Sequence, residues 1–237
     1  MTENPTRPRA IFFDAGNTLV RIDYAAIAAQ LAALGVSVAP EALQRADWRA
    51  RVRVDDELFA GRASSTESRT AAARYLAHVL ADVGVTDGAT VEAMVAWRSR
   101  YNAPRGIFCA PEPAAPAALA AARQAGCVTG VISNSNGAIA GILESLGLTP
   151  CLDFVLDSFV VGVEKPDPRI FRLALERAGV RPDQAVYIGD FYSVDVLGAR
   201  AVGMSAILLD PGRCWGARDC PAAPDVAAAV AVALGAV

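Results

Sequence analysis

Residue types that usually build zinc sites and disulfide frameworks are scarce in this sequence. Its 237 residues include one histidine, His78, and five cysteines, and no two cysteines stand in a Cys-x-x-Cys pair. Structural zinc needs several closely spaced thiolate or imidazole ligands, and a disulfide framework needs an even set of cysteines, so we expect neither. Reduced thiols are the ordinary state inside cells, and we therefore expect a cytoplasmic protein.

Long apolar runs and blocks of like charge are also absent. The apolar tail from 226 to 237 has 12 residues, whereas a membrane-spanning helix takes about 20. The polar start MTENPTRPRA lacks the apolar stretch of a signal peptide. The formal net charge is −3, and the basic residues are dispersed among acidic ones, unlike those of a nucleic-acid-binding surface. We expect neither a membrane nor a nucleic acid as a partner.

Lysine is the scarcest charged residue. Of the 22 basic residues, Lys165 is the single lysine and the rest are arginines. An ammonium is a compact point charge and a guanidinium is a planar fork, so the two are not interchangeable at a tight site. Lys165 is therefore a candidate site residue.

Strand and helix patterns alternate along most of the chain. The apolar run 10–13 ends in Asp14 and predicts a buried parallel strand, followed by a turn at 15–18. From residue 107 onward the patterns predict strands at 127–133, 154–157, 185–189 and 205–209, and helices at 113–124, 139–146, 168–178 and 194–202. This alternation predicts right-handed crossovers and a parallel sheet with helices on both faces.

The segment from about Tyr24 to Arg105 has helical spacing instead. Apolar stripes end at Gly35 and at Gly84, and no strand pattern of comparable quality interrupts them. We therefore expect an inserted helical module. His78 lies opposite the second stripe, and we interpret it as a residue on a solvated helix face rather than a catalyst.

Reactive side chains follow three of the expected strands. The first ends in Asp14, the second in Ser133 and Asn134, and the fourth in Asp190, while Lys165 lies in the crossover before that strand. Ligands of an open parallel sheet bind beyond the carboxyl ends of its strands. We therefore expect these residues to meet at one edge of the sheet.

The ordered set resembles the four motifs of the haloacid dehalogenase-like (HAD) hydrolase superfamily. The matching segments are Phe13-Asp14-Ala15-Gly16-Asn17-Thr18-Leu19, Ile132-Ser133-Asn134, Lys165 in Val163–Pro168, and Ile188-Gly189-Asp190 with Asp195 five residues later. The resemblance implies an α/β fold, with a Rossmann-like parallel-sheet core at 1–22 and 105–237. It also implies a small all-α cap at 23–104, after the first motif.

The resemblance also implies a mechanism and a set of roles. Asp14 would attack phosphorus and form an aspartyl-phosphate, with Lys165 and Ser133 as its catalytic partners. Ser133, Asn134 and Lys165 would bind the phosphate. A Mg²⁺ ion would be held by Asp14, the backbone carbonyl of Gly16, and Asp190, with Asp195 behind these ligands. The substrate would be a small phosphorylated metabolite.

One position departs from the phosphatase pattern. Phosphatases of this superfamily carry an acid/base aspartate two residues after the nucleophile, and this chain has Gly16 there. General acid–base help is worth about 10²–10⁴-fold, so we expect turnover that is slow or restricted to activated phosphates.

Other readings stay open because of that departure. One is a catalytically silent phosphate-binding or interaction protein on the same fold. The other is a metal-independent dehalogenase-type hydrolase, which the acids at 190 and 195 disfavour. A phosphonatase needs a lysine in its cap, and 23–104 contains none. The sequence leaves the substrate, the oligomeric state and the pathway open.

Overall fold

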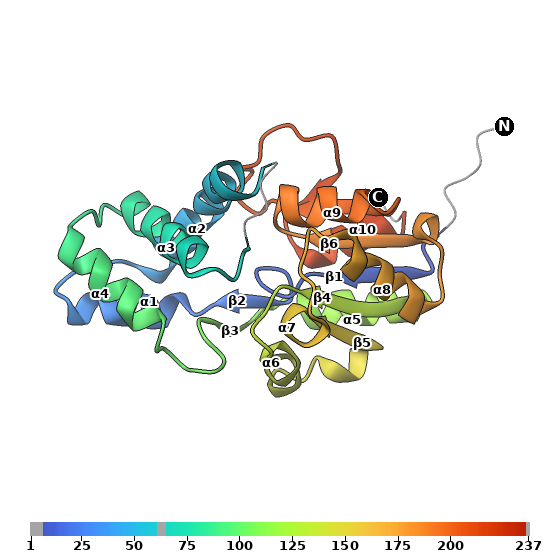
Figure 1. Cartoon of the computed structure of the whole chain (residues 1–237), viewed down its shortest axis with the longest axis horizontal. Coiled ribbons are helices and arrows are strands. Elements are labelled where there is room, and N and C mark those ends of the chain that lie inside the picture. Colours follow the sequence, from blue (N-terminus) through green and yellow to red (C-terminus); the bar gives the residue numbers. More distant parts are fainter. Residues whose placement is uncertain (1–6, 61–64, 236–237) are drawn as a thin grey trace. The chain divides into compact units, whose positions relative to one another are not determined.

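The computed structural model describes residues 7–60 and 65–235. The chain forms two compact units, one made of Met1–Arg21 and Pro111–Val237 and the other of Ile22–Ala110 (Figure 1). Both crossings between the units fall in short strands, β2 (Val20–Ile22) and β3 (Phe108–Pro111), which pair with each other. The sequence did not predict this ribbon.

The first unit is built on a six-stranded sheet with the strand order β5-β4-β1-β6-β7-β8. The strands are β1 (Ala10–Phe13), β4 (Val128–Ser133), β5 (Phe154–Asp157), β6 (Ala185–Gly189), β7 (Ser205–Leu209) and β8 (Ala222–Ala223). Their pairings are parallel. The fold is therefore the expected α/β class with a parallel sheet.

Strand β1 lies in the middle of the sheet because all four of its residues are apolar and fully buried. It pairs with β4 on one side, where Phe13 faces Val131, and with β6 on the other, where Phe13 faces Ile188. The Asp14 N–H continues the ladder by donating to the Ile188 carbonyl at 2.8 Å. The strands that follow in sequence add on opposite sides of β1, which places a topological switch point beside Asp14.

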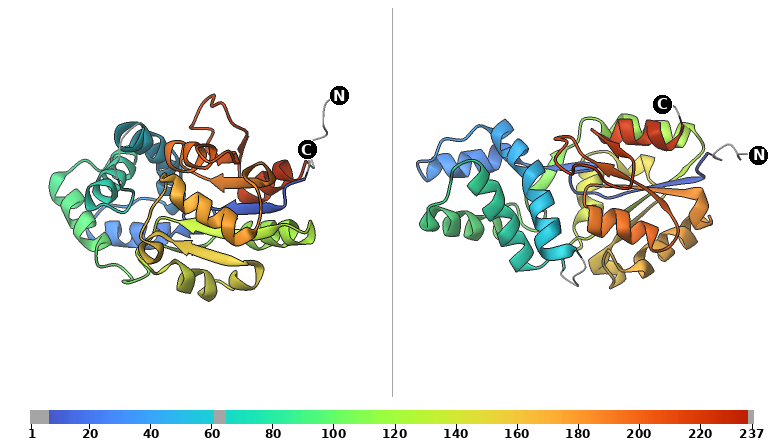
Figure 2. Two further views of the ribbon diagram at one scale, coloured as in Figure 1. Left: turned by 45° about the vertical axis from the view of Figure 1, so that its right-hand side comes forward. Right: turned by 90° about the horizontal axis from the view of Figure 1, so that it is seen from above.

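Helices cover both faces of this sheet (Figure 2). One face packs against α5 (Ala115–Gln124), α6 (Ile139–Ser145) and α10 (Val226–Ala233), which share a core cluster with Ile11, Phe13, Val131 and Ile188. The other face, which holds Phe12 and Tyr187, packs against α8 (Pro168–Ala178) and α9 (Leu197–Arg200). Helix α8 begins at the Asp167 N-cap and ends at Gly179, whose φ of 63° suits glycine.

Besides its parts of β2 and β3, the described part of the second unit contains four α-helices and one π-helical turn. They are α1 (Tyr24–Ala33), α2 (Pro40–Val54), η1 (Asp55–Phe59), α3 (Arg69–Asp82) and α4 (Gly88–Arg98). The side chains of Asp23, Ser68 and Asp87 cap α1, α3 and α4 by accepting backbone N–H groups. Apolar stripes on these helices form the unit's core, with Ile27, Leu31, Leu76, Val79 and Leu80 buried.

Some local expectations needed correction. The helix expected at 194–202 is a π-helical turn, η4 (Tyr192–Val196), followed by the one-turn α9. His78 does not lie on an open face, because its ring is half-buried and its Nε2 lies 3.0 Å from Glu57 Oε2. Strand β8 and the short elements η2 (Thr149–Cys151), α7 (Ser158–Val161) and η3 (Pro182–Gln184) were not predicted.

Among the helices in the described part of the chain, none is long and apolar enough to cross a membrane.

Candidate active site

The predicted site residues meet at the carboxyl edge of the sheet. Asp14 follows β1, Ser133 ends β4, and Asp190 follows β6. Strands β4 and β6 flank β1, so the fold brings these three side chains to neighbouring strand ends although they are far apart in sequence. Asp14, Asp190 and Asp195 are all buried, and each offers a carboxylate oxygen within 4.8 Å of the others.

Lys165 lies directly against this group of acids. Its Nζ donates to Asp14 Oδ1 at 2.5 Å and to Asp195 Oδ1 at 2.8 Å, and its side chain is only 3% exposed. The single lysine of the chain is thus the cation between the candidate nucleophile and a second acid. A buried ammonium in contact with two carboxylates stabilises negative charge at that point far more than a solvated one would.

Burial and charge set the protonation of the Asp14–Lys165 pair. Burial raises the pKa of the Asp14 carboxyl to about 6, while Lys165 acts in the opposite direction and Asp195 adds a further increase. For Lys165, burial by itself would lower the pKa, but Asp14 and Asp195 outweigh it and raise the pKa above its ordinary value. The ammonium therefore stays charged.

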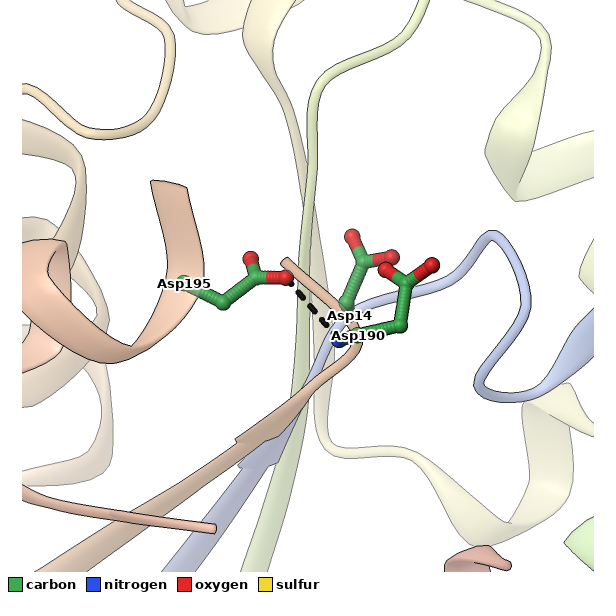
Figure 3. Close-up of side chains that lie close together, drawn as sticks. All are labelled: Asp14, Asp190 and Asp195. Atoms are coloured by element: carbon green, nitrogen blue, oxygen red, sulfur yellow. Dashed lines mark hydrogen bonds between the residues drawn. The ribbon is translucent and has the colours of Figure 1, made fainter. Parts of the chain in front are cut away.

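Asp195 is a positioning acid whose two oxygens are both engaged. Oδ1 accepts from Lys165, and Oδ2 accepts the backbone N–H groups of Asp190 at 3.0 Å and Phe191 at 2.9 Å. Figure 3 shows Asp195 reaching from its helical turn toward the backbone of Asp190, while the Asp14 and Asp190 carboxylates lie side by side. Asp195 thereby fixes the loop that carries Asp190.

A glycine makes this arrangement possible. A Cβ built on Gly189 would lie 2.5 Å from the Asp195 carboxyl carbon and 2.5 Å from its Oδ2. Any side chain at 189 would therefore push Asp195 away from the 190–191 backbone. This contact explains why the last motif has a glycine at position 189.

Asn17 connects the first loop of the site to the last. Its Nδ2 donates to Asp190 Oδ2 at 3.2 Å, and its backbone has a φ of 52°, in the left-handed region that asparagine tolerates better than most residues. The sequence pattern indicates Asn17 only as part of the turn at 15–18. The sequence around Asn17 does not indicate its side-chain contact with Asp190, because the two residues are 173 positions apart.

Asn134 holds the backbone of the lysine. Its Nδ2 donates to the Lys165 carbonyl at 2.9 Å, and its Oδ1 accepts the Lys165 backbone N–H at 2.7 Å. Ser133 is buried at the end of β4, with its Oγ 3.3 Å from the Asn134 carbonyl. Asn134 thus has a structural task in addition to the predicted one, and phosphate binding by Ser133 and Asn134 stays a prediction.

The donor set fits a divalent cation. Three buried carboxylates lie close together and two of them contact one ammonium, so the ionised group has two negative charges in excess. Buried charges are normally paired or bound to metals. Mg²⁺ prefers oxygen ligands and is usually held by one or two carboxylates, with substrate phosphate and water completing the shell. Asp14 and Asp190 are suited as ligands, whereas both Asp195 oxygens are already occupied.

Comparison with known families supports the assignment made from this geometry. The model of the haloacid dehalogenase-like hydrolase family matches residues 8–203. The chain therefore belongs to this family of hydrolases, as the four motifs predicted.

Several relatives are similar in sequence to part of this chain. The mouse "haloacid dehalogenase-like hydrolase domain-containing protein 3" is 47% identical over 91 residues, which cover 38% of this chain and 36% of that protein. The "phosphoserine phosphatase" of Thermus thermophilus is 41% identical over 101 residues, covering 42% and 41%. The chain thus spans about two-fifths of the length of these relatives.

Solved structures share the fold over nearly the whole length. A 2-haloacid dehalogenase from Pseudomonas syringae matches with a TM-score of 0.56 and 27% identity, covering 97% of this chain and 99% of that one. This likeness and the family match confirm the HAD-like α/β fold with its Rossmann-like parallel sheet.

Proposed function

We propose that this chain is a Mg²⁺-dependent phosphohydrolase that acts on a small phosphorylated metabolite through an aspartyl-phosphate on Asp14. The observation that carries the proposal is the contact of Lys165 Nζ with Asp14 Oδ1 at 2.5 Å, beside Asp190 at the end of the neighbouring strand. Relatives named as a phosphoserine phosphatase and as a glyceraldehyde 3-phosphate phosphatase support the same class of reaction.

In the proposed reaction a carboxylate oxygen of Asp14 attacks phosphorus, and the bond from phosphorus to the leaving oxygen breaks. Lys165 offsets the charge of Asp14 and of the phosphoryl oxygens as it develops. Ser133 and Asn134 are proposed phosphate ligands beside it. Asp14, the Gly16 carbonyl and Asp190 would hold Mg²⁺, which supplies Lewis-acid stabilisation of the phosphoryl charge when it is bound.

Gly16 decides which substrates this arrangement serves. It offers no proton to a departing alkoxide and no base to activate water against the aspartyl-phosphate. Aryl and acyl phosphates need little protonation of their leaving groups. We therefore propose that activated phosphates react faster than alkyl phosphates, and that the helical unit 22–110 acts as the cap that selects the substrate.

A second candidate is a catalytically silent phosphate-binding protein, which the glycine at 16 favours. Metal-independent dehalogenation is a weaker alternative. Solved dehalogenases share the fold, but the two excess negative charges of the Asp14, Asp190 and Asp195 cluster favour a bound cation, which such chemistry does not use. A cytoplasmic location stays a prediction from the cysteine content.

The test is hydrolysis of an aryl phosphate and of acetyl phosphate with Mg²⁺ and with EDTA. We expect Mg²⁺-dependent turnover that is lost in Asp14→Asn. It should be retained in the control Asp183→Asn, whose exposed carboxylate forms an ion pair with the neighbouring Arg181. Turnover that persists in EDTA or in Asp14→Asn contradicts the proposal.

The variant Gly16→Asp separates the two candidates. It restores the carboxylate at the position of the family's acid/base residue, so a slow phosphatase should gain turnover on an alkyl phosphate. Absence of turnover in both wild type and Gly16→Asp, with Mg²⁺ still bound, would favour the silent binding protein.

A further inference from the structure

Tyr187, which lies outside the four motifs, is the third residue that contacts the ammonium of Lys165, after Asp14 and Asp195. An ammonium has three N–H donors and no acceptor. Besides Asp14 and Asp195, Lys165 Nζ contacts the hydroxyl of Tyr187 at 2.9 Å. The number of contacts thus equals the number of donors, and the nitrogen is fixed from three directions.

The direction of the Tyr187 hydrogen bonds follows from this geometry. Because Lys165 can only donate, the Tyr187 oxygen must accept from it and offer its own proton elsewhere. Two acceptors lie within reach, the Ile132 carbonyl at 3.0 Å and Asp195 Oδ1 at 3.3 Å. Tyr187 therefore joins β6 to the end of β4 and to the lysine in the crossover.

The hydroxyl is not explained by packing. Tyr187 is fully buried, and its ring meets Phe171 edge-on with centroids 5.3 Å apart, a contact that phenylalanine would make equally well. A buried hydroxyl costs free energy unless it is hydrogen-bonded. Burial, and then the nearby Asp195 and Asp14, raise the pKa of Tyr187 well above its ordinary value, so the group stays neutral.

We propose that Tyr187 is a positioning residue that holds the Lys165 ammonium between Asp14 and Asp195. Without the hydroxyl, one hydrogen of this buried ammonium loses its protein acceptor, and the nitrogen can tilt away from Asp14. The effect on turnover rests on the proposed function, whereas the effect on the lysine itself does not.

The single lysine makes this proposal directly measurable. Labelling lysine with ¹⁵N at Nζ gives one side-chain ammonium signal for the whole chain. In the wild type we expect a slowly exchanging ammonium. In Tyr187→Phe we expect its hydrogens to exchange with water about tenfold to a hundredfold faster, the factor that corresponds to losing one hydrogen bond to a charged group.

The matched control is Phe171→Leu. It removes the ring that packs on Tyr187 but none of the hydrogen bonds to Lys165. A purely structural role of Tyr187 would make both variants exchange alike, and that result would overturn the proposal. So would a wild-type ammonium that exchanges too fast to be observed, an outcome that does not depend on whether Tyr187→Phe folds.

Steady-state kinetics give an independent test of the positioning role of Tyr187. On acetyl phosphate with Mg²⁺, Tyr187→Phe should lower kcat about tenfold to a hundredfold with little change in KM, since Tyr187 acts through Lys165. Phe171→Leu should change kcat less, and an equal loss in both variants counts against the proposal. If the wild type shows no turnover, the proposed function fails, and the ammonium measurement still decides the role of Tyr187.

Discussion

Asn17 connects the loop after the nucleophile to the proposed metal ligand Asp190 through a side-chain hydrogen bond of 3.2 Å. The same residue has a φ of 52°, so the position constrains both the backbone and the side chain. Glycine would satisfy the backbone requirement alone. A substitution by glycine at position 17 therefore separates the two requirements, because it keeps the backbone conformation and removes the side-chain contact with Asp190.

We predict that Asn17→Gly keeps the loop conformation and weakens Mg²⁺ binding. Losing one hydrogen bond of about 1 kcal/mol corresponds to roughly a fivefold rise in the dissociation constant, measured by titration calorimetry. The control is Asn102→Gly, which also replaces an asparagine at positive φ but lies in the helical unit. Equal Mg²⁺ affinity of Asn17→Gly and the wild type would show that the Asn17 side chain does not contribute to the metal site.

At the scale of elements, close contact between β6 and η4 positions the acids. The Asp195 side chain lies where a Cβ of Gly189 would be, so strand and turn approach as closely as the backbone allows. The π-helical turn begins two residues earlier than the expected helix and gives Asp195 its place beside the 190–191 backbone.

We predict that Gly189→Ala lowers the free energy of unfolding by about 1–3 kcal/mol, the usual cost of overpacking a tight site. It should also abolish turnover, because Asp195 must move away from Lys165. The control Gly141→Ala lies in α6 with open space around its Cβ. That change should be neutral or stabilising by about 0.5–1 kcal/mol. Urea unfolding of both variants decides the matter, and equal stabilities would refute the steric account.

At the scale of the whole molecule, each compact unit needs its own contacts between elements that are distant in sequence. In the helical unit, Asp82 at the end of α3 pairs with Arg49 and Arg53 of α2, each at 2.6 Å. Burial raises the pKa of Asp82, but the hydrogen bonds and charges of the two arginines outweigh it, and the net pKa is lowered. These ion pairs join two helices across more than 25 residues of chain.

The sign of the resulting pH dependence follows from that lowered pKa. The stabilisation is fully present above the ordinary aspartate pKa of about 4, and it is lost as the pH falls through the lower pKa of the folded protein. We predict that Asp82→Asn lowers stability at neutral pH by about 0.2–1 kcal/mol per exposed pair. The difference from wild type should vanish in strong acid.

Thermal unfolding at several pH values tests this expectation. Asp183→Asn is the local counterpart, because Asp183 pairs with Arg181 two residues away and its side chain is 66% exposed. We expect a smaller change there. A stability difference for Asp82→Asn that does not depend on pH would contradict the ionic origin.

Local sequence patterns determined the α/β class, the helical insert and most of the core elements. The expected strands at 154–157, 185–189 and 205–209 and the helix at 168–178 agree with β5, β6, β7 and α8 at both ends. These elements have strong apolar periodicity bounded by turn or capping residues, so near neighbours in the chain suffice to define them. The four ordered motifs likewise sufficed to predict the family.

Only the tertiary structure decided how the site is held together. The contacts of Lys165 with Asp14, Asp195 and Tyr187 join positions that are 151, 30 and 22 residues apart. A tyrosine within an apolar strand reads as a core residue, and nothing in its local pattern shows that its hydroxyl faces an ammonium. The ribbon of β2 and β3, like the role of Asn17, depends on segments brought together from distant parts of the chain. The sequence pattern of a segment shows only the periodicity of that segment. Which residues meet across the sheet depends on the order of the strands, and tertiary packing decides that order.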